Sequence, residues 1–233
     1  MGALKAVAIT GVSLVVLGGA AYFGDGFARS HVEGQVAQQI QTGMNLPEPP
    51  TVELGGMPFS TVFITRRLPT AKLSAASVPL EVSDQRIAVD DVSVEVRDLT
   101  VDGDQITIGY GRAEGVVGYP SLTQLAGIPV EADSEPGRVR ASYTAELFGQ
   151  ELVAMVSAVP LLSEGRDQLL LDQPQIQVAG FPLSDDIAQW IVDELVAPIR
   201  FDLPYGLTPA AVSASNAGVT VAVTAENYLL PQQ

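Results

Sequence analysis

The stretch of sequence that decides the fold runs from residue 92 to residue 110 and reads VSVEVRDLTVDGDQITIGY. From Val92 to Arg97 valines alternate with polar residues, which is the pattern of a strand with one apolar face. Asp102-Gly103 is a favoured hairpin turn, and the alternation resumes after it from Ile106 to Tyr110. The stretch therefore predicts two antiparallel strands joined by a tight turn.

The same alternation recurs on both sides of this stretch. Further strands are predicted at residues 51–54, 73–77, 139–147 and 219–223. The runs at 153–156 and 169–171 are apolar at both odd and even positions. Such runs indicate strands that are covered on both faces of a sheet.

An amphipathic helix is predicted over residues 27–44. Val32, Val36 and Ile40 recur every four positions, with polar residues on the other side. The segment ends before Pro47, the first of three prolines that cannot continue a helix.

Two shorter helices are predicted at residues 119–127 and 185–196. Helices at only three points among strands in hairpin order indicate an α+β fold with a mostly antiparallel sheet. No Gly/Ser-rich linker or shift in composition interrupts the later part of the chain, so residues 25–233 are predicted to form a single domain.

The first 24 residues predict contact with a membrane. Lys5 precedes eighteen uncharged residues, Ala6 to Phe23, which span about 27 Å as a helix. Residues 1–24 are therefore interpreted as a signal peptide cleaved after Ala21 or as an uncleaved signal anchor; a buried helix of a cytoplasmic protein is the weaker alternative. Because a positive flank stays inside, residues 25–233 are expected outside the cytoplasm, in the cell envelope or periplasm.

The composition excludes several classes of protein. The chain has 233 residues, of which 47% are hydrophobic and 17% charged, so it is not intrinsically disordered. Its net charge of −15 disfavours a nucleic-acid partner. The absence of cysteine excludes disulfides, thiolate metal sites and cysteine nucleophiles.

Enzyme signatures are also missing from the sequence. It has no G-x-S-x-G, phosphate-binding loop, H-E-x-x-H or dinucleotide fingerprint. His31 is interpreted as a helix-surface residue and Asp102-Gly103-Asp104 as a turn rather than a calcium loop. Asp90-Asp91 is interpreted as a solvated strand start and Asp185-Asp186 as a helix N-terminus. We therefore predict no catalytic residues, no metal and no cofactor.

The order of several short motifs resembles the LmeA-like phospholipid-binding family of actinobacterial cell envelopes. The membrane segment and the helix around 32–44 come first, followed by Gly56-Met57-Pro58-Phe59. Near the C-terminus, the resemblance rests on Gly180-Phe181-Pro182, Pro204-Tyr205-Gly206-Leu207 and the turn Asn216-Ala217-Gly218. It covers nearly the whole chain. The segment 60–67 departs from the family pattern, which has a leucine and a glycine after the Pro-Phe pair.

This resemblance implies a fold related to the tubular lipid-binding superfamily, in which a curved antiparallel sheet wraps a long helix and encloses an apolar groove. It also implies a non-enzymatic protein that binds or shuttles phospholipid or glycolipid and supports envelope lipid assembly. Two alternatives stay open: a carboxylate-dependent hydrolase of envelope lipids, and an anchored structural or interaction module with a solid core.

On this interpretation, the acyl chains would be lined by Met57, Phe59, Val62, Phe63, Leu122, Leu125, Phe181, Trp190 and Ile191. Any of these residues could instead be ordinary core. Arg66 and Arg67 are the candidate headgroup contacts, since guanidinium groups bind phosphate with two hydrogen bonds. A second basic pair, Arg138 and Arg140, is predicted on one strand face. The alternative for all four arginines is a surface ion pair with the abundant acids.

Overall fold

The fold is given by a computed structural model, which describes residues 25–56, 61–82, 85–102, 105–147, 150–166, 168–178, 199–200 and 207–229. The predicted membrane segment 1–24 and the predicted helix 185–196 lie outside these residues. Of the helices that the structure describes, none combines the length and hydrophobicity needed to span a bilayer.

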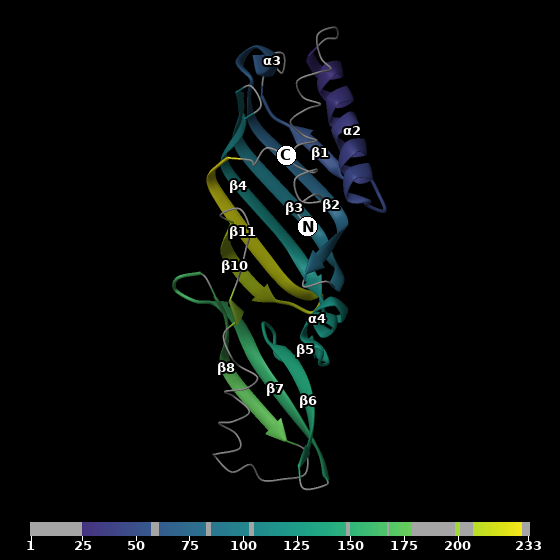
Figure 1. The fold of residues 1–233 in the computed structure, drawn as a ribbon, viewed down its shortest axis with the longest axis vertical. Coiled ribbons are helices and arrows are strands. Elements are labelled where there is room, and N and C mark those ends of the chain that lie inside the picture. Colours follow the sequence, from purple (N-terminus) through teal and green to yellow (C-terminus); the bar gives the residue numbers. More distant parts are fainter. Residues whose placement is uncertain are drawn as a thin grey trace.

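The described strands form two antiparallel sheets that follow each other along the longest axis of the molecule (Figure 1). The first has the order β1-β2-β3-β4-β11-β10, and the second has the order β5-β6-β7-β8-β9. The elements are α2 Asp25–Met44, β1 Thr51–Leu54, α3 Thr61–Thr65, β2 Arg67–Val82, β3 Gln85–Asp102, β4 Gln105–Gly118, α4 Tyr119–Ala126, β5 Val130–Ala132, β6 Val139–Leu147, β7 Gln150–Leu162, β8 Gln168–Val178, β9 Ile199–Arg200, β10 Thr208–Ala214 and β11 Gly218–Leu229. The predicted α+β class with mostly antiparallel strands is confirmed.

The predicted hairpin forms the centre of the six-stranded sheet. Strands β3 and β4 pair antiparallel, and Asp102 at the end of β3 pairs with Gln105 at the start of β4. This register confirms the hairpin, but it keeps Asp102 in the strand, so the two connecting residues are 103–104, one position later than the predicted Asp102-Gly103; residues 103–104 are not described. On the adjoining strand β2, Ala75 pairs with Val92, so the valine face predicted for β3 continues across the sheet.

Strand β3 is irregular in two places that the alternation does not reveal. The register with β4 shifts between Asp90 and Ser93, and Asp91 has a φ of 49°. This β-bulge bends the strand and lies inside β3, so the interpretation of Asp90-Asp91 as a strand start is wrong. Asp98 has a φ of 53°. Because of this turn in the backbone, the next β3 side chain after Val96 that faces the inside of the sheet is Leu99.

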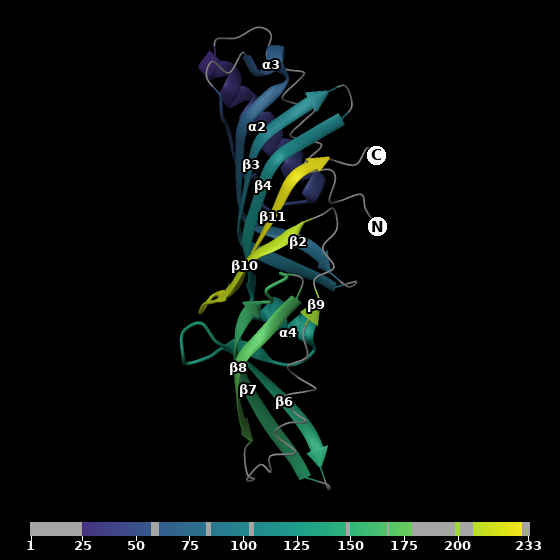
Figure 2. The same cartoon turned by 90° about the vertical axis from the view of Figure 1, so that its left-hand side faces the viewer.

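Helix α2 follows the predicted segment 27–44 and begins two residues earlier. Its apolar stripe is fully covered, since Val32, Val36 and Ile40 are 0–1% exposed. Because each of these residues follows the last by about one helical turn, one side of α2 is buried against the sheet. The six-stranded sheet curves, with α2 along one of its faces (Figure 2). The main core lies between them.

The short helix predicted at 119–127 is confirmed as α4. It begins after Gly118 and ends at Gly127, whose φ of 70° is the left-handed conformation that stops a helix. The Thr123 hydroxyl accepts a hydrogen bond from the backbone N–H of Val130, at 2.9 Å, which ties α4 to β5. Helix α4 thus lies where the two sheets meet (Figure 1).

Candidate functional site

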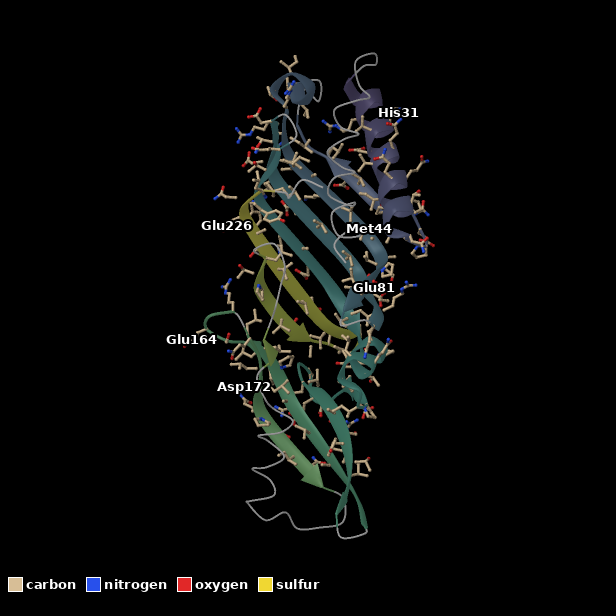
Figure 3. The ribbon with its side chains drawn as sticks, viewed as in Figure 1. His31, Met44, Glu81, Glu164, Asp172 and Glu226 are labelled. Atoms are coloured by element: carbon tan, nitrogen blue, oxygen red, sulfur yellow. The ribbon has the colours of Figure 1, made fainter. Side chains whose placement is uncertain are left out.

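An apolar cavity of about 160 Å³ lies between α2 and the inner face of the six-stranded sheet. The end of α2, the following loop and the first four strands contribute its walls. The lining residues are Ile40, Met44, Leu46, Val52, Ala71, Lys72, Leu73, Ala75, Val78, Val92, Val94, Val96, Leu99 and Ile108. Met44 lies where the C-terminal end of α2 meets the sheet (Figure 3).

Small and branched side chains make this cavity. On β2, Ala71 and Ala75 are 8–9% exposed and present only a methyl group to the interior. On β3, three of the lining residues are valines, which are stiff at χ1 and short, so they leave space below the helix; Leu99 is the fourth. Lys72 is the one lining residue with a charged group, and it is exposed overall.

The cavity has room for a short apolar group. A cavity of about 150 Å³ lined by aliphatic and aromatic side chains stays dry and binds benzene, a ligand of six carbons. The present cavity of about 160 Å³ therefore matches a similar length of acyl chain. At ~0.8 kcal/mol for each buried methylene, six carbons contribute ~5 kcal/mol before the entropic costs of binding.

Polar contacts hold the N-terminal half of α2 to the end of β1. The Glu33 carboxylate accepts a hydrogen bond from the backbone N–H of Leu54, at 2.8 Å. The Arg29 guanidinium donates to the carbonyl oxygen of Gly56. The half of α2 that covers the cavity faces it with apolar side chains instead, at Ile40 and Met44.

The outer face of the same sheet is polar. Glu53, Lys72, Glu95 and Arg112 stand side by side on four neighbouring strands, with alternating charge. The side chain of Arg97 donates a hydrogen bond to Glu95, at 2.8 Å, and so lowers the pKa of that carboxyl. Arg97 also pairs with Glu95, and Arg112 with Glu114, so this face is charged and the inner face is the apolar side.

The structure places only part of the predicted lining. Val62 on α3 is 2% exposed and belongs to the buried cluster that borders the cavity. Leu122 and Leu125 are half-buried on α4, at the opposite end of the six-stranded sheet from α3 (Figure 1). Phe63 is in α3, but its side chain is not described. Met57, Phe59, Phe181, Trp190 and Ile191 lie outside the described residues.

The two candidate headgroup arginines follow α3 and are exposed. Arg67 forms an ion pair with Asp98, with 2.6 Å between Nη2 and Oδ1. Arg66 has no ion pair with any residue in the described part of the chain, and its φ of 53° turns the backbone between α3 and β2. Within the described residues, only Arg67 of these two arginines is therefore part of an ion pair.

Arg138 is not a surface residue and does not lie in a strand, contrary to the sequence interpretation. It directly precedes β6 and is 6% exposed. Its guanidinium donates to the Ser157 hydroxyl, to the Ser157 carbonyl and to the Gln173 carbonyl. Arg140 does form the expected surface ion pair, with Glu131 at 3.0 Å. Arg138 is therefore a structural residue of the second sheet.

Catalytic and metal-binding geometry is not found in the described residues. They contain no cluster of three or more histidine, aspartate or glutamate side chains that could hold a metal ion. His31 lies on the exposed side of α2 (Figure 3), with its Nε2 atom 3.0 Å from the side-chain nitrogen of Gln35. Burial raises the pKa of Tyr119, whose hydroxyl donates to the Ser215 carbonyl. None of these groups faces the cavity.

The site is thus an apolar cavity between a helix and the inner face of an antiparallel sheet. A family model described as LmeA-like phospholipid-binding matches residues 23–224, so the chain belongs to this family, and the resemblance noted in the sequence is confirmed. No curated protein and no solved structure matched the chain.

Proposed function

We propose that this protein binds phospholipid by enclosing part of one acyl chain in the cavity between α2 and the six-stranded sheet. The observation that carries the proposal is the cavity itself, whose walls are apolar in a chain of the phospholipid-binding family. Water gains little in such a space, whereas each methylene transferred into it is stabilised by burial.

The proposed role is non-enzymatic binding or shuttling of phospholipid or glycolipid at the outer face of the cytoplasmic membrane, in support of envelope lipid assembly. The uncharged segment after Lys5 supports this location, as a signal peptide or an anchor. The curved sheet beside α2 is proposed to act as the lipid groove of the tubular lipid-binding fold.

The predicted lining residues extend this site in the proposal. Val62 already borders the cavity through the buried cluster. Met57, Phe59 and Phe63 are next to it in the sequence, so we propose that this segment continues the apolar path. Phe181, Trp190 and Ile191 are proposed to cover a further part of the lipid. Arg66, which has no ion pair within the described residues, is proposed to contact an anionic headgroup.

Filling the cavity tests this function. Ala75 lines the cavity, and its neighbour Ala76 points to the exposed side of β2. Ala75→Phe is expected to fill part of the space and reduce phospholipid transfer between vesicles at least about ten-fold, since several methylenes lose their place. Ala76→Phe adds the same side chain outside and is expected to transfer lipid at the rate of the unchanged protein.

Mass spectrometry of the purified protein gives an independent measurement. Phospholipid or glycolipid should co-purify with the unchanged protein and with Ala76→Phe, and be depleted in Ala75→Phe. Circular dichroism checks that both variants fold. Equal lipid content in the two folded variants would show that the cavity is not the binding site.

A further inference from the structure

We propose that the end of the molecule that carries α3 docks on the surface of a phospholipid bilayer, with Ile64 inserted among the lipid headgroups. This inference rests on the proposed lipid-binding function, because it names the surface from which the lipid is taken. We call this part of the molecule the docking tip; it consists of α3, Arg66, Arg67 and the end of β11 at Leu229.

Helix α3 has two apolar sides with opposite surroundings. Val62 is 2% exposed and packs into the core, whereas Ile64 is 84% exposed. A large aliphatic side chain with that exposure is less stable in water than it would be if it were buried. This loss is offset only if another apolar phase covers Ile64.

A second exposed apolar residue lies at the same end of the sheet. Arg67 pairs with Thr100, Thr100 with Thr107, and Thr107 with Leu229, so these residues form one row across β2, β3, β4 and β11. Leu229 is 53% exposed. Leu229 thus ends the row that begins at Arg67, directly after α3, and gives this edge of the sheet a second exposed apolar side chain.

The sequence next to the tip has the composition of an interfacial segment. Met57-Pro58-Phe59 precedes α3, and Leu230 follows Leu229. Arg66 and Arg67 follow α3 in the sequence of a chain whose net charge is −15. Apolar residues flanked by arginine are typical of segments that lie in a lipid interface.

The local charge allows an anionic surface to approach. Asp98 is paired with Arg67, so the unpaired charges described at the tip are Arg66 and the exposed Asp102. The remaining acids of the chain are screened beyond about 8 Å at physiological ionic strength. Insertion of Ile64 is therefore the main contribution, and Arg66 adds a smaller, salt-sensitive one.

The tip is next to the end of the cavity. Leu68 pairs with Leu99 and Leu99 with Ile108, in the row directly beside the tip row. Leu99 and Ile108 line the cavity. One residue along a strand is about 3.4 Å, so a docked tip holds this end of the cavity close to the headgroups. Docking there gives an acyl chain a short path from bilayer to cavity.

A single fluorophore on α3 tests the docking in the full chain. The sequence has no cysteine, so Thr65→Cys provides a unique attachment point beside an unchanged Ile64. A nitrobenzoxadiazole label there is expected to shift to the blue with vesicles of phosphatidylcholine and phosphatidylglycerol, and to be quenched by lipid-borne doxyl groups. The same label at Glu164→Cys, in the exposed turn between β7 and β8 (Figure 3), is expected to stay aqueous.

Two further changes separate the apolar and electrostatic contributions. Ile64→Asp in the Thr65→Cys chain should require at least about ten-fold more lipid for the same quenching. Because Ile64 is exposed, this change should leave the fold intact. Arg66→Gln should weaken docking about five-fold on anionic vesicles and leave it unchanged on pure phosphatidylcholine.

Three results would overturn the proposal. The first is an aqueous label at position 65 on protein that sediments with vesicles. The second is equal quenching at positions 65 and 164. The third is a blue shift that occurs without vesicles and grows with protein concentration. This result would show that a second copy of the chain, rather than a bilayer, covers the docking tip.

Binding of a dispersed short-chain phospholipid tells this proposal apart from the function on which it rests. Ile64→Asp should retain that binding, whereas Ala75→Phe should lose it and still dock. If the chain docks on vesicles but does not bind the dispersed phospholipid, the proposed function is contradicted and the docking proposal stands. If the chain binds the dispersed phospholipid but never docks, only the docking proposal is contradicted.

Discussion

At the scale of single residues, Arg138 provides hydrogen-bond donors at a bulge that interrupts the strand pairing of the second sheet. The pairing of β7 with β8 shifts between Ser157 and Val159, and Gln173 in this bulge has a φ of 48°. Pro174 follows and has no N–H to give to the ladder. The guanidinium of Arg138 supplies donors there, at 2.7 Å to the Gln173 carbonyl and 2.9 Å to the Ser157 carbonyl.

Arg138→Ala is expected to destabilise the protein by about 3 kcal/mol, because it leaves buried acceptors without donors. Arg140→Ala is the matched control. Arg140 lies two residues after Arg138 and forms an exposed ion pair, so its loss should lower the free energy of unfolding by less than about 1 kcal/mol. Urea unfolding followed by circular dichroism measures both changes. Equal losses in the two variants would contradict the structural role of Arg138.

Asp133 makes stability depend on pH. The backbone N–H of Glu135 donates to its carboxylate at 2.9 Å and is the main reason that the pKa of Asp133 is lowered. Since the folded pKa lies below the unfolded one, the stabilisation is complete above the unfolded pKa and is lost as pH falls through the folded pKa. Asp133→Asn should therefore be less stable than the unchanged protein at pH 7, by less than about 1 kcal/mol, and the difference should disappear as pH falls below the folded pKa of Asp133. Urea unfolding at pH 7 and at a series of lower pH values measures the difference.

At the scale of elements, the bulge in β3 depends on a glycine of β4. A Cβ atom at Gly115 would lie 2.6 Å from Val89 Cγ1, and valine has little rotamer freedom to move away. Gly115→Ala should cost about 1–3 kcal/mol through this overlap. At Gly111 the nearest atom to an added Cβ is 3.7 Å away, so Gly111→Ala should be neutral or slightly stabilising. Thermal unfolding of the two variants tests the difference; similar effects would show that the bulge tolerates a side chain.

The strands could be predicted from the sequence because each has a local signal, as in the alternation from Val92 to Arg97. Their partners could not, since β11 pairs with β4 through backbone groups that every residue carries. The same limit applies to the site. The helix stripe and the valine face can be recognised in the sequence. The role of small residues such as Ala71 cannot, and neither can that of the left-handed Asp98, which turns Leu99 inward.

At the scale of the whole molecule, the proposed location predicts the side of the membrane on which the sheets lie. An alkaline phosphatase fused after Gln233 should be active, because Lys5 stays inside and the acidic remainder is exported. A green fluorescent protein fused at the same residue should stay dark if export is through the general secretory route. The reverse pattern would contradict the proposed location and leave the cavity unaffected.

The cavity belongs to one of two sheets, and its size sets how much of a lipid the protein can enclose. About 160 Å³ accommodates about six carbons, far fewer than a membrane acyl chain has. Affinity for single-chain phospholipids should therefore rise about four-fold with each methylene until about six are buried, and then level off. Ala75→Phe should move this plateau to shorter chains, whereas Ala76→Phe should not. Calorimetric titration over a series of chain lengths measures the plateau. A continued rise to sixteen carbons would show that α2 moves away from the sheet to admit the whole chain, starting from its apolar end at Met44 rather than from the half held by Glu33.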